Sequence, residues 1–127
     1  GVSERIGFSI ADALSPSFLD GKKFDAIISN PPYIPASVIP TLAPEVKLEP
    51  RRALDGGDDG LDFYRAITKK ARTSLSDGGF VLYEVGIGQA EEVAAIGETY
   101  GFSARIFPDL SGISRAVLLK QINSKGI

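Results

Sequence analysis

The chain has 127 residues, of which 43% are hydrophobic, and this is enough for one compact domain with an ordinary core. Its net charge is −2 and its basic residues form no run longer than a pair, which argues against a nucleic-acid-binding surface because such a surface needs clustered cations. There is no Cys and no His, so thiol nucleophiles, imidazole bases and the usual zinc sites are excluded, and a metal would have oxygen ligands only.

The chain carries no recognisable targeting or membrane segment. No apolar run approaches the length of a membrane span, and its start has no signal-peptide pattern, so we expect a cytoplasmic protein without membrane contact. There is no Met, and the chain opens on Gly1-Val2, so we interpret it as a fragment or a processed form of a longer protein. Residues 1–122 are expected to form the domain, and residues 123–127 (NSKGI) a polar tail.

The first part of the chain predicts two strands and a long loop. Residues 5–11 (RIGFSIA) alternate apolar and polar, the period of a half-buried strand, and Asp12 ends it. Residues 24–29 (FDAIIS) form a short apolar run that is typical of a strand buried on both faces. Residues 30–50 contain six prolines and form a connection that is too long for a simple turn, so this loop is a candidate functional segment.

A helix is predicted over residues 61–75 because the apolar residues there fall on one helical stripe. The stripe consists of Leu61, Tyr64, Ile67, Ala71 and Leu75. The aspartates of the preceding loop, 55–60 (DGGDDG), are expected to cap this helix, and Asp77-Gly78-Gly79 to end it. The same aspartates lack two oxygen ligands of an EF-hand, so capping is the better interpretation.

The last part predicts a buried strand over 80–86, a helix over 89–101 with Gly101 as its C-cap, and two strands over 103–109 and 114–121. The final two strands should be antiparallel because their connection is too short for a crossover helix. Together these elements predict an α/β fold with a mainly parallel sheet and an antiparallel last strand.

The string Asn30-Pro31-Pro32-Tyr33 directly follows a predicted strand, at the end of a parallel sheet where ligands bind. The prolines fix the backbone and lack N–H donors, so the Asn30 side-chain oxygen and the Pro31 carbonyl form a stiff pair of acceptors beside the Tyr33 ring. A planar –NH2 group fits this pair and would be aimed at an electrophile, such as the methyl group of a sulfonium donor. The alternative is a rigid turn without a binding role.

The string resembles the signature of class I S-adenosylmethionine-dependent methyltransferases that act on planar amino groups. Residues 48–65, 83–93 and 109–119 are similar to successive blocks of the release-factor glutamine methyltransferases. The resemblance implies S-adenosylmethionine as cofactor and, as protein partner, a peptide-chain release factor of translation termination. The methyl acceptor would be the side-chain amide nitrogen of the Gln in its Gly-Gly-Gln motif.

The resemblance also implies site residues. Asn30, Pro31 and Tyr33 would be catalytic, and these three with Pro32 would bind the substrate amide. Asp12 and Ala13 would bind the donor's adenine, and Asn30 its methionine end. For Asp12 the alternative is a solvated carboxylate at the end of a strand.

The resemblance is incomplete, because the family's first two strands and its Gly-rich donor loop have no counterpart here, nor has its N-terminal helical domain. The family's strand order, 3-2-1-4-5-7-6, then implies a gap beside residues 24–29 or another pairing there, and self-association through open sheet edges. We expect the chain alone to be inactive.

Three other functions stay open, and the nearest to the resemblance is glutamine methylation of a ribosomal protein. A DNA adenine N6-methyltransferase would use the same pair of acceptors on the amino group of a flipped base, although the acidic composition disfavours this function. The chain could also be a non-catalytic, partner-binding remnant of the fold. Glu84, at the end of a predicted strand, either shapes the pocket or pairs with Arg115.

Overall fold

The computed structural model describes residues 1–122, and the predicted polar tail lies outside the described residues. The elements in chain order are η1 (Val2–Arg5), β1 (Phe24–Ser29), η2 (Ala36–Thr41), α1 (Pro44–Lys47), η3 (Arg51–Ala53), α2 (Asp62–Ser74), β2 (Leu75–Glu84), α3 (Ala90–Thr99), β3 (Phe102–Pro108) and β4 (Ser114–Gln121). No helix among the described residues is both long and apolar enough to cross a bilayer.

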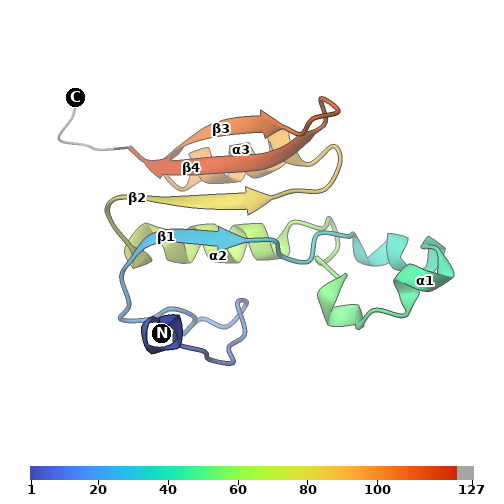
Figure 1. Ribbon diagram of the computed structural model, residues 1–127. Coiled ribbons are helices and arrows are strands. Elements are labelled where there is room, and N and C mark those ends of the chain that lie inside the picture. The colour runs from blue at the N-terminus through green and yellow to red at the C-terminus, as the bar shows by residue number, and fades with distance from the viewer. Residues whose placement is uncertain (123–127) are drawn as a thin grey trace.

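The four strands form one sheet in the order β1-β2-β4-β3 (Figure 1). β1 and β2 are parallel, and β4 is antiparallel to both of its neighbours, β2 and β3. Three strands therefore run in one direction and β4 runs against them. This confirms the predicted α/β fold with an antiparallel last strand, and the order agrees with the 4-5-7-6 part of the order that the resemblance implied.

Both long helices lie behind the sheet in the view of Figure 1, α2 behind β1 and α3 behind β3 and β4. All five residues of the predicted stripe are buried, three of them on α2 and Leu61 and Leu75 directly at its two ends, which confirms the stripe. α3 approaches β4 closely at Gly97, where a Cβ atom would lie 2.3 Å from the Leu119 side chain. The core thus forms between the two helices and one face of the sheet.

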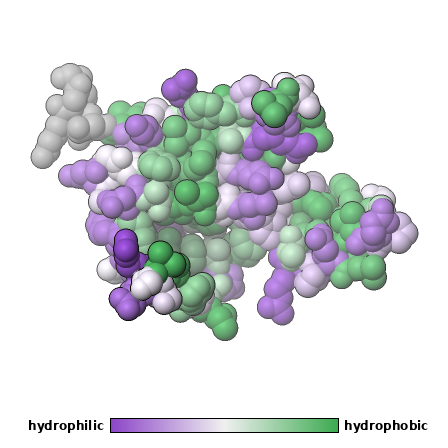
Figure 2. All heavy atoms as spheres, in the orientation of Figure 1, coloured by the Kyte–Doolittle hydropathy of each residue, from purple (hydrophilic) through white to green (hydrophobic). Residues whose placement is uncertain are grey.

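The opposite face of the sheet is uncovered, and Figure 2 shows apolar side chains gathered on it. Ile28 is 72% exposed, whereas Val81, which pairs with the preceding residue Ile27 and faces the helices, is fully buried. The prediction that residues 24–29 and 80–86 are buried on both faces was therefore wrong. Neighbouring residues of a strand point to opposite faces, and only one face has helices on it.

The predicted strand over residues 5–11 was also wrong. Arg5 ends η1, residues 6–11 have no regular structure, and the side chains of the segment are exposed, with Phe8 at 91%. A strand needs a neighbour for its backbone hydrogen bonds, and no strand among residues 1–122 pairs with this segment or with the outer edge of β1. The gap that the resemblance implied beside β1 is thus left open.

The α2–β2 junction is tighter than predicted. The helix ends at Ser74, and β2 begins at once with Leu75, so residues 77–79 lie inside the strand instead of ending the helix. The Ser76 hydroxyl donates to the Phe24 carbonyl over 3.1 Å and supports the start of the pairing with β1. Gly101, which has a φ of 90°, follows the C-cap Tyr100 of α3 and lies at the predicted end of that helix.

Two buried tyrosines connect α2 to β2. The Tyr64 hydroxyl donates to the Glu84 carbonyl over 2.8 Å, and the Tyr83 hydroxyl lies 2.8 Å from the Thr68 hydroxyl. Their rings meet edge to face with centroids 5.0 Å apart. Tyr64 therefore fixes the carboxyl end of β2, from which the loop to α3 departs.

Stability should fall in alkali because of these tyrosines. Burial raises the pKa of both Tyr64 and Tyr83 above the ordinary value of 10.0, since the anion is poorly solvated in the core. Above pH 10 the unfolded chain loses these protons while the folded chain keeps them. We expect these two groups to leave the free energy of unfolding unchanged below pH 10. Above pH 10 they should lower it, by at most about 1.4 kcal/mol per pH unit for each tyrosine.

Urea unfolding followed by circular dichroism between pH 8 and 11.5 would measure this loss. The double variant Tyr64→Phe/Tyr83→Phe is the control, because it removes both phenols and leaves the lysines to titrate as before. Its midpoint should fall less between pH 9.5 and 11.5 than that of the unchanged chain. Equal falls in the two proteins would show that the phenols do not carry the effect.

Candidate functional site

Residues 30–33 lie just beyond the carboxyl end of β1, beside the carboxyl end of the parallel strand β2. Pro31 is buried, and Asn30 is exposed. Asn30 lines a shallow hollow on the uncovered face of the sheet, together with Ile28 and Glu84. The Asn30 side chain forms no hydrogen bond within residues 1–122, so its oxygen and amide are free to meet a ligand.

The chain after Tyr33 is held by the loop that precedes α2. Ile34 donates its N–H to the Leu54 carbonyl over 3.1 Å, and its own carbonyl accepts from the Gly56 N–H over 2.9 Å. Ala36 donates to the Gly57 carbonyl over 2.9 Å. Two loops that are distant in sequence thus pair for a few residues, which fixes the end of the Asn-Pro-Pro-Tyr segment.

Three buried glycines leave room for this segment. A Cβ atom on Gly56 would lie 2.8 Å from the Pro32 carbonyl oxygen, and one on Gly60 only 2.3 Å from the Tyr33 carbonyl oxygen. A Cβ on Gly86 would lie 2.7 Å from the Tyr33 ring. We call Gly56, Gly60 and Gly86 the glycine cradle. Its members come from the loop before α2 and the loop after β2, so both loops contact the Pro32-Tyr33 backbone or ring.

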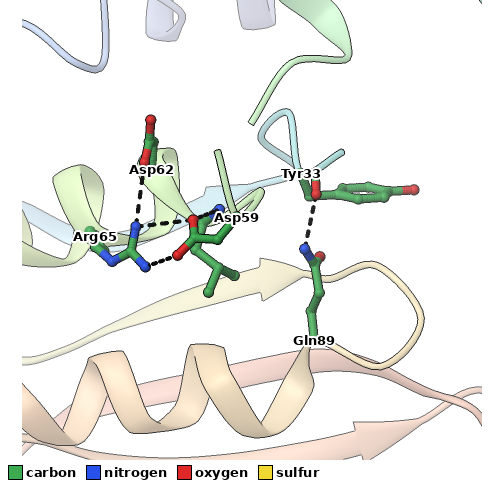
Figure 3. Close-up of polar contacts among 6 residues, drawn as sticks. Tyr33, Asp59, Asp62, Arg65 and Gln89 are labelled. Carbon is green, nitrogen blue, oxygen red and sulfur yellow. Dashed lines mark hydrogen bonds and ion pairs between the residues drawn. The ribbon is translucent and has the colours of Figure 1, made fainter. Parts of the chain in front are cut away.

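Gln89 completes the contacts between these loops. Its Nε2 donates to the Tyr33 carbonyl over 2.9 Å, and its Oε1 accepts from the Gly86 N–H over 3.0 Å. Figure 3 shows the side chain reaching from the start of α3 to the backbone of Tyr33. Both ends of one amide are therefore used to tie the β2–α3 loop to the Asn-Pro-Pro-Tyr segment.

The aspartates before α2 organise their own loop. Asp55 accepts from the Gly57 N–H over 2.9 Å and Asp59 from the Leu61 N–H over 3.0 Å, and Asp59 also pairs with Arg65 (Figure 3). That pairing lowers the pKa of Asp59 below its ordinary value. The N-cap residue is Leu61, and no side chain caps the free N–H groups of the first helical turn, so the prediction of helix capping by these aspartates was wrong.

The structure does not bring the adenine-site candidates together with Asn30. Asp12 is exposed, and its carboxylate accepts from the Leu14 N–H over 2.9 Å. Ala13 lines a groove against α2 with Lys69 and Lys70, separate from the hollow that contains Asn30. Among the described residues, no pocket therefore spans from Ala13 to Asn30, and the expected adenine and amide positions lie in separate hollows.

Glu84 does not pair with Arg115. The Arg115 guanidinium lies 3.3 Å from the Asp109 carboxylate, and Glu84 is exposed at the rim of the hollow. The interpretation of a buried Glu84–Arg115 pair was therefore wrong. The hydrogen bonds that Asp109 accepts lower the pKa of that carboxyl below its ordinary value, and the bond from the Ile113 N–H has the largest effect. These bonds shape the turn between β3 and β4.

Sequence reasoning missed Gln89 and the glycine cradle. The region of Gln89 was assigned only as the start of a helix, because nothing local distinguishes a glutamine that bonds across two loops from an exposed one. The glycines of 55–60 and 86–88 carried a usable signal, since glycine is the residue typical of places where the backbone is approached closely.

No protein-family model matches the chain. Over 101 residues it is 50% identical to the release factor glutamine methyltransferase of Geobacter sulfurreducens, covering 78% of this chain and 36% of that protein. Over 119 residues it is 43% identical to the enzyme of the same name from Clostridium acetobutylicum, covering 92% of this chain and 42% of that protein. The chain thus spans about two fifths of the length of these curated relatives.

A solved structure supports the same relationship. The protein-(glutamine-N5) methyltransferase (release factor-specific) from Alicyclobacillus acidocaldarius superposes with a TM-score of 0.54 at 32% identity, over 87% of this chain and 56% of that one. Sequence and fold agree, and the resemblance noted from the sequence is confirmed. The chain is thus similar, in sequence and in fold, to part of the release factor glutamine methyltransferases.

Proposed function

We propose that this chain contributes the amide-binding half of an enzyme that methylates the side-chain amide nitrogen of the Gln in the Gly-Gly-Gln motif of peptide-chain release factors. The observation that carries the proposal is the Asn30 side chain, which is exposed and has no hydrogen-bond partner within residues 1–122, on a rigidly held Asn-Pro-Pro-Tyr segment. The names of the relatives support the same activity. A release factor as substrate would place the reaction in the cytoplasm.

The roles of the residues follow from their chemistry. The Asn30 Oδ1 and the Pro31 carbonyl would each accept one hydrogen of the substrate –NH2 group, which raises the electron density on nitrogen and fixes its direction. The Tyr33 ring would pack on the amide plane, and Pro32 would keep the backbone extended. No residue need remove a proton before the transfer, which suits a chain without His.

S-adenosylmethionine is the proposed cofactor, and it supplies a methyl group on a positively charged sulfur. Asp12 and Ala13 are proposed for its adenine and Asn30 for its methionine end. The described residues do not join these positions in one pocket, so we propose that the donor site is completed by further polypeptide and that this chain alone is inactive.

A chimera tests the proposal. The part of the Geobacter sulfurreducens relative that precedes the matched region would be joined to residues 1–127, and transfer of a labelled methyl group to a release factor would be measured. We expect transfer to the factor and none to its Gly-Gly-Gln→Gly-Gly-Ala variant or to adenine-containing DNA. A folded chimera that binds S-adenosylmethionine and labels only the DNA would overturn the proposal.

A further inference from the structure

Gln89 has a single orientation in this fold. Its backbone N–H donates to the Gly86 carbonyl over 3.1 Å, and its carbonyl accepts from the Val93 N–H over 3.0 Å at the start of α3. Its side-chain oxygen faces a donor, the Gly86 N–H, and its side-chain nitrogen faces an acceptor, the Tyr33 carbonyl. A turn of the amide by 180° would place like groups together at both contacts, so the amide is fixed.

The Tyr33 carbonyl is held from two sides. Gln89 Nε2 binds it, and Gly60 lies so close that an added Cβ would come within 2.3 Å of it and within 3.0 Å of the Gln89 nitrogen. The position of this carbonyl therefore depends on Gln89, on a backbone that allows no side chain, and on the bond from the Ile34 N–H of the same peptide unit to the Leu54 carbonyl. The Tyr33 ring in turn lies against Gly86, the second partner of Gln89.

Because the two prolines are stiff, the fixed position of the Tyr33 carbonyl also restricts the position of Asn30. Asn30 follows directly on β1, and the next anchored atom is the Tyr33 carbonyl. Between these points Pro31 and Pro32 have fixed φ angles, so the segment has few remaining ways to move when both of its ends are held. Release of the Tyr33 end would let the two acceptors change their spacing.

We propose that Gln89 is a positioning residue for amide binding: by holding the Tyr33 carbonyl it sets the Asn30 side chain and the Pro31 carbonyl at the distance that a planar –NH2 group requires. The inference rests on the proposed function of this site. Gln89 acts through Tyr33 and does not touch the substrate.

Hydrogen exchange of the unchanged chain and two variants tests whether Gln89 holds the loop. Gln89→Met keeps the length of the side chain and loses both bonds, whereas Gln89→Glu keeps an acceptor for Gly86 and turns an oxygen toward the Tyr33 carbonyl. We expect the Ile34 and Gly56 amides to exchange about 2-fold to 10-fold faster in both variants. The Gly86 amide should exchange faster in the Met variant only.

Gln121→Met is the matched control. Gln121 also donates from its side chain to a backbone carbonyl, that of Arg72, over 3.3 Å, but it lies at the end of β4 and outside these loops. It should leave the Ile34, Gly56 and Gly86 amides unchanged. Unchanged exchange of the Ile34 and Gly56 amides in both Gln89 variants would overturn the inference, whatever the enzyme does.

Kinetics in the chimera tests the consequence for the reaction. A misplacement of about 1 Å lowers a rate about 100-fold, so Gln89→Met should lower kcat at least 10-fold while Gln121→Met leaves it unchanged. Faster exchange with an unchanged kcat would overturn the positioning role. An inactive unchanged chimera would instead count against the proposed function, and the exchange data would still decide whether Gln89 holds the loop.

Discussion

Replacing Asn30 by alanine is expected to lower methyl transfer by the chimera about 100-fold to 1000-fold, the effect of removing one pre-positioned hydrogen-bonding group from a reacting centre. The loss should appear in kcat, because the acceptor acts on the nitrogen as it becomes a nucleophile. Asn30 has no side-chain partner within residues 1–122, so the free energy of unfolding should change by less than about 0.5 kcal/mol. Single-turnover transfer and urea unfolding measure the two effects.

Asn30→Asp is the informative companion variant. A carboxylate oxygen can replace the amide oxygen as acceptor, so this variant should retain more activity than the alanine variant. Ser29→Ala changes the preceding residue and serves as a control for local disturbance. Equal activity of the unchanged and Asn30→Ala proteins would show that the Asn30 oxygen does not bind the reacting amide.

Replacing Gly60 by alanine should destabilise the chain by roughly 2–5 kcal/mol, the sum of a left-handed backbone with a side chain and of overpacking. Gly60 has a φ of 80°, and the added Cβ would lie 2.3 Å from the Tyr33 carbonyl oxygen. The atom in the way is backbone that the prolines keep stiff, so relief requires movement of the Asn-Pro-Pro-Tyr segment. Urea unfolding would measure the loss.

Gly78→Ala separates the two contributions. Gly78 also has a φ of 80°, but no atom lies within 4 Å of its added Cβ, so this variant reports the backbone cost alone. The difference between the two variants should be about 1–3 kcal/mol, the cost of overpacking. Equal destabilisation would mean that the Tyr33 carbonyl yields freely and that the glycine cradle does not constrain it.

The fold could be predicted wherever the deciding interactions are periodic. The stripe on α2 predicted a helix because one side of that helix alone faces the sheet, and the short connection between β3 and β4 required an antiparallel pair. Residues 5–11 have the period of a strand, but period gives only the direction of side chains, and the pairing that makes a strand depends on a neighbour elsewhere in the chain.

The site could be predicted in part for a similar reason. The chemistry of residues 30–33 is local, because two prolines restrict the backbone whatever surrounds them. The hydrogen bond that holds this segment is not local. The Gln89 amide meets the Tyr33 carbonyl across 56 residues of sequence, and this contact exists only when β1 and β2 lie side by side. The roles of Asn30, Asp12 and Ala13 stay predictions.

The uncovered face of the sheet and the exposed apolar side chains of residues 5–11 have a thermal consequence. The folded chain exposes 8530 Å², against roughly 6500 Å² expected for a compact monomer of its mass. Unfolding therefore exposes less new apolar surface than usual, and the heat-capacity change should fall below the ordinary value of about 12–15 cal/mol/K per residue. A smaller heat-capacity change means a flatter stability curve, so the free energy of unfolding should vary gently with temperature on both sides of its maximum.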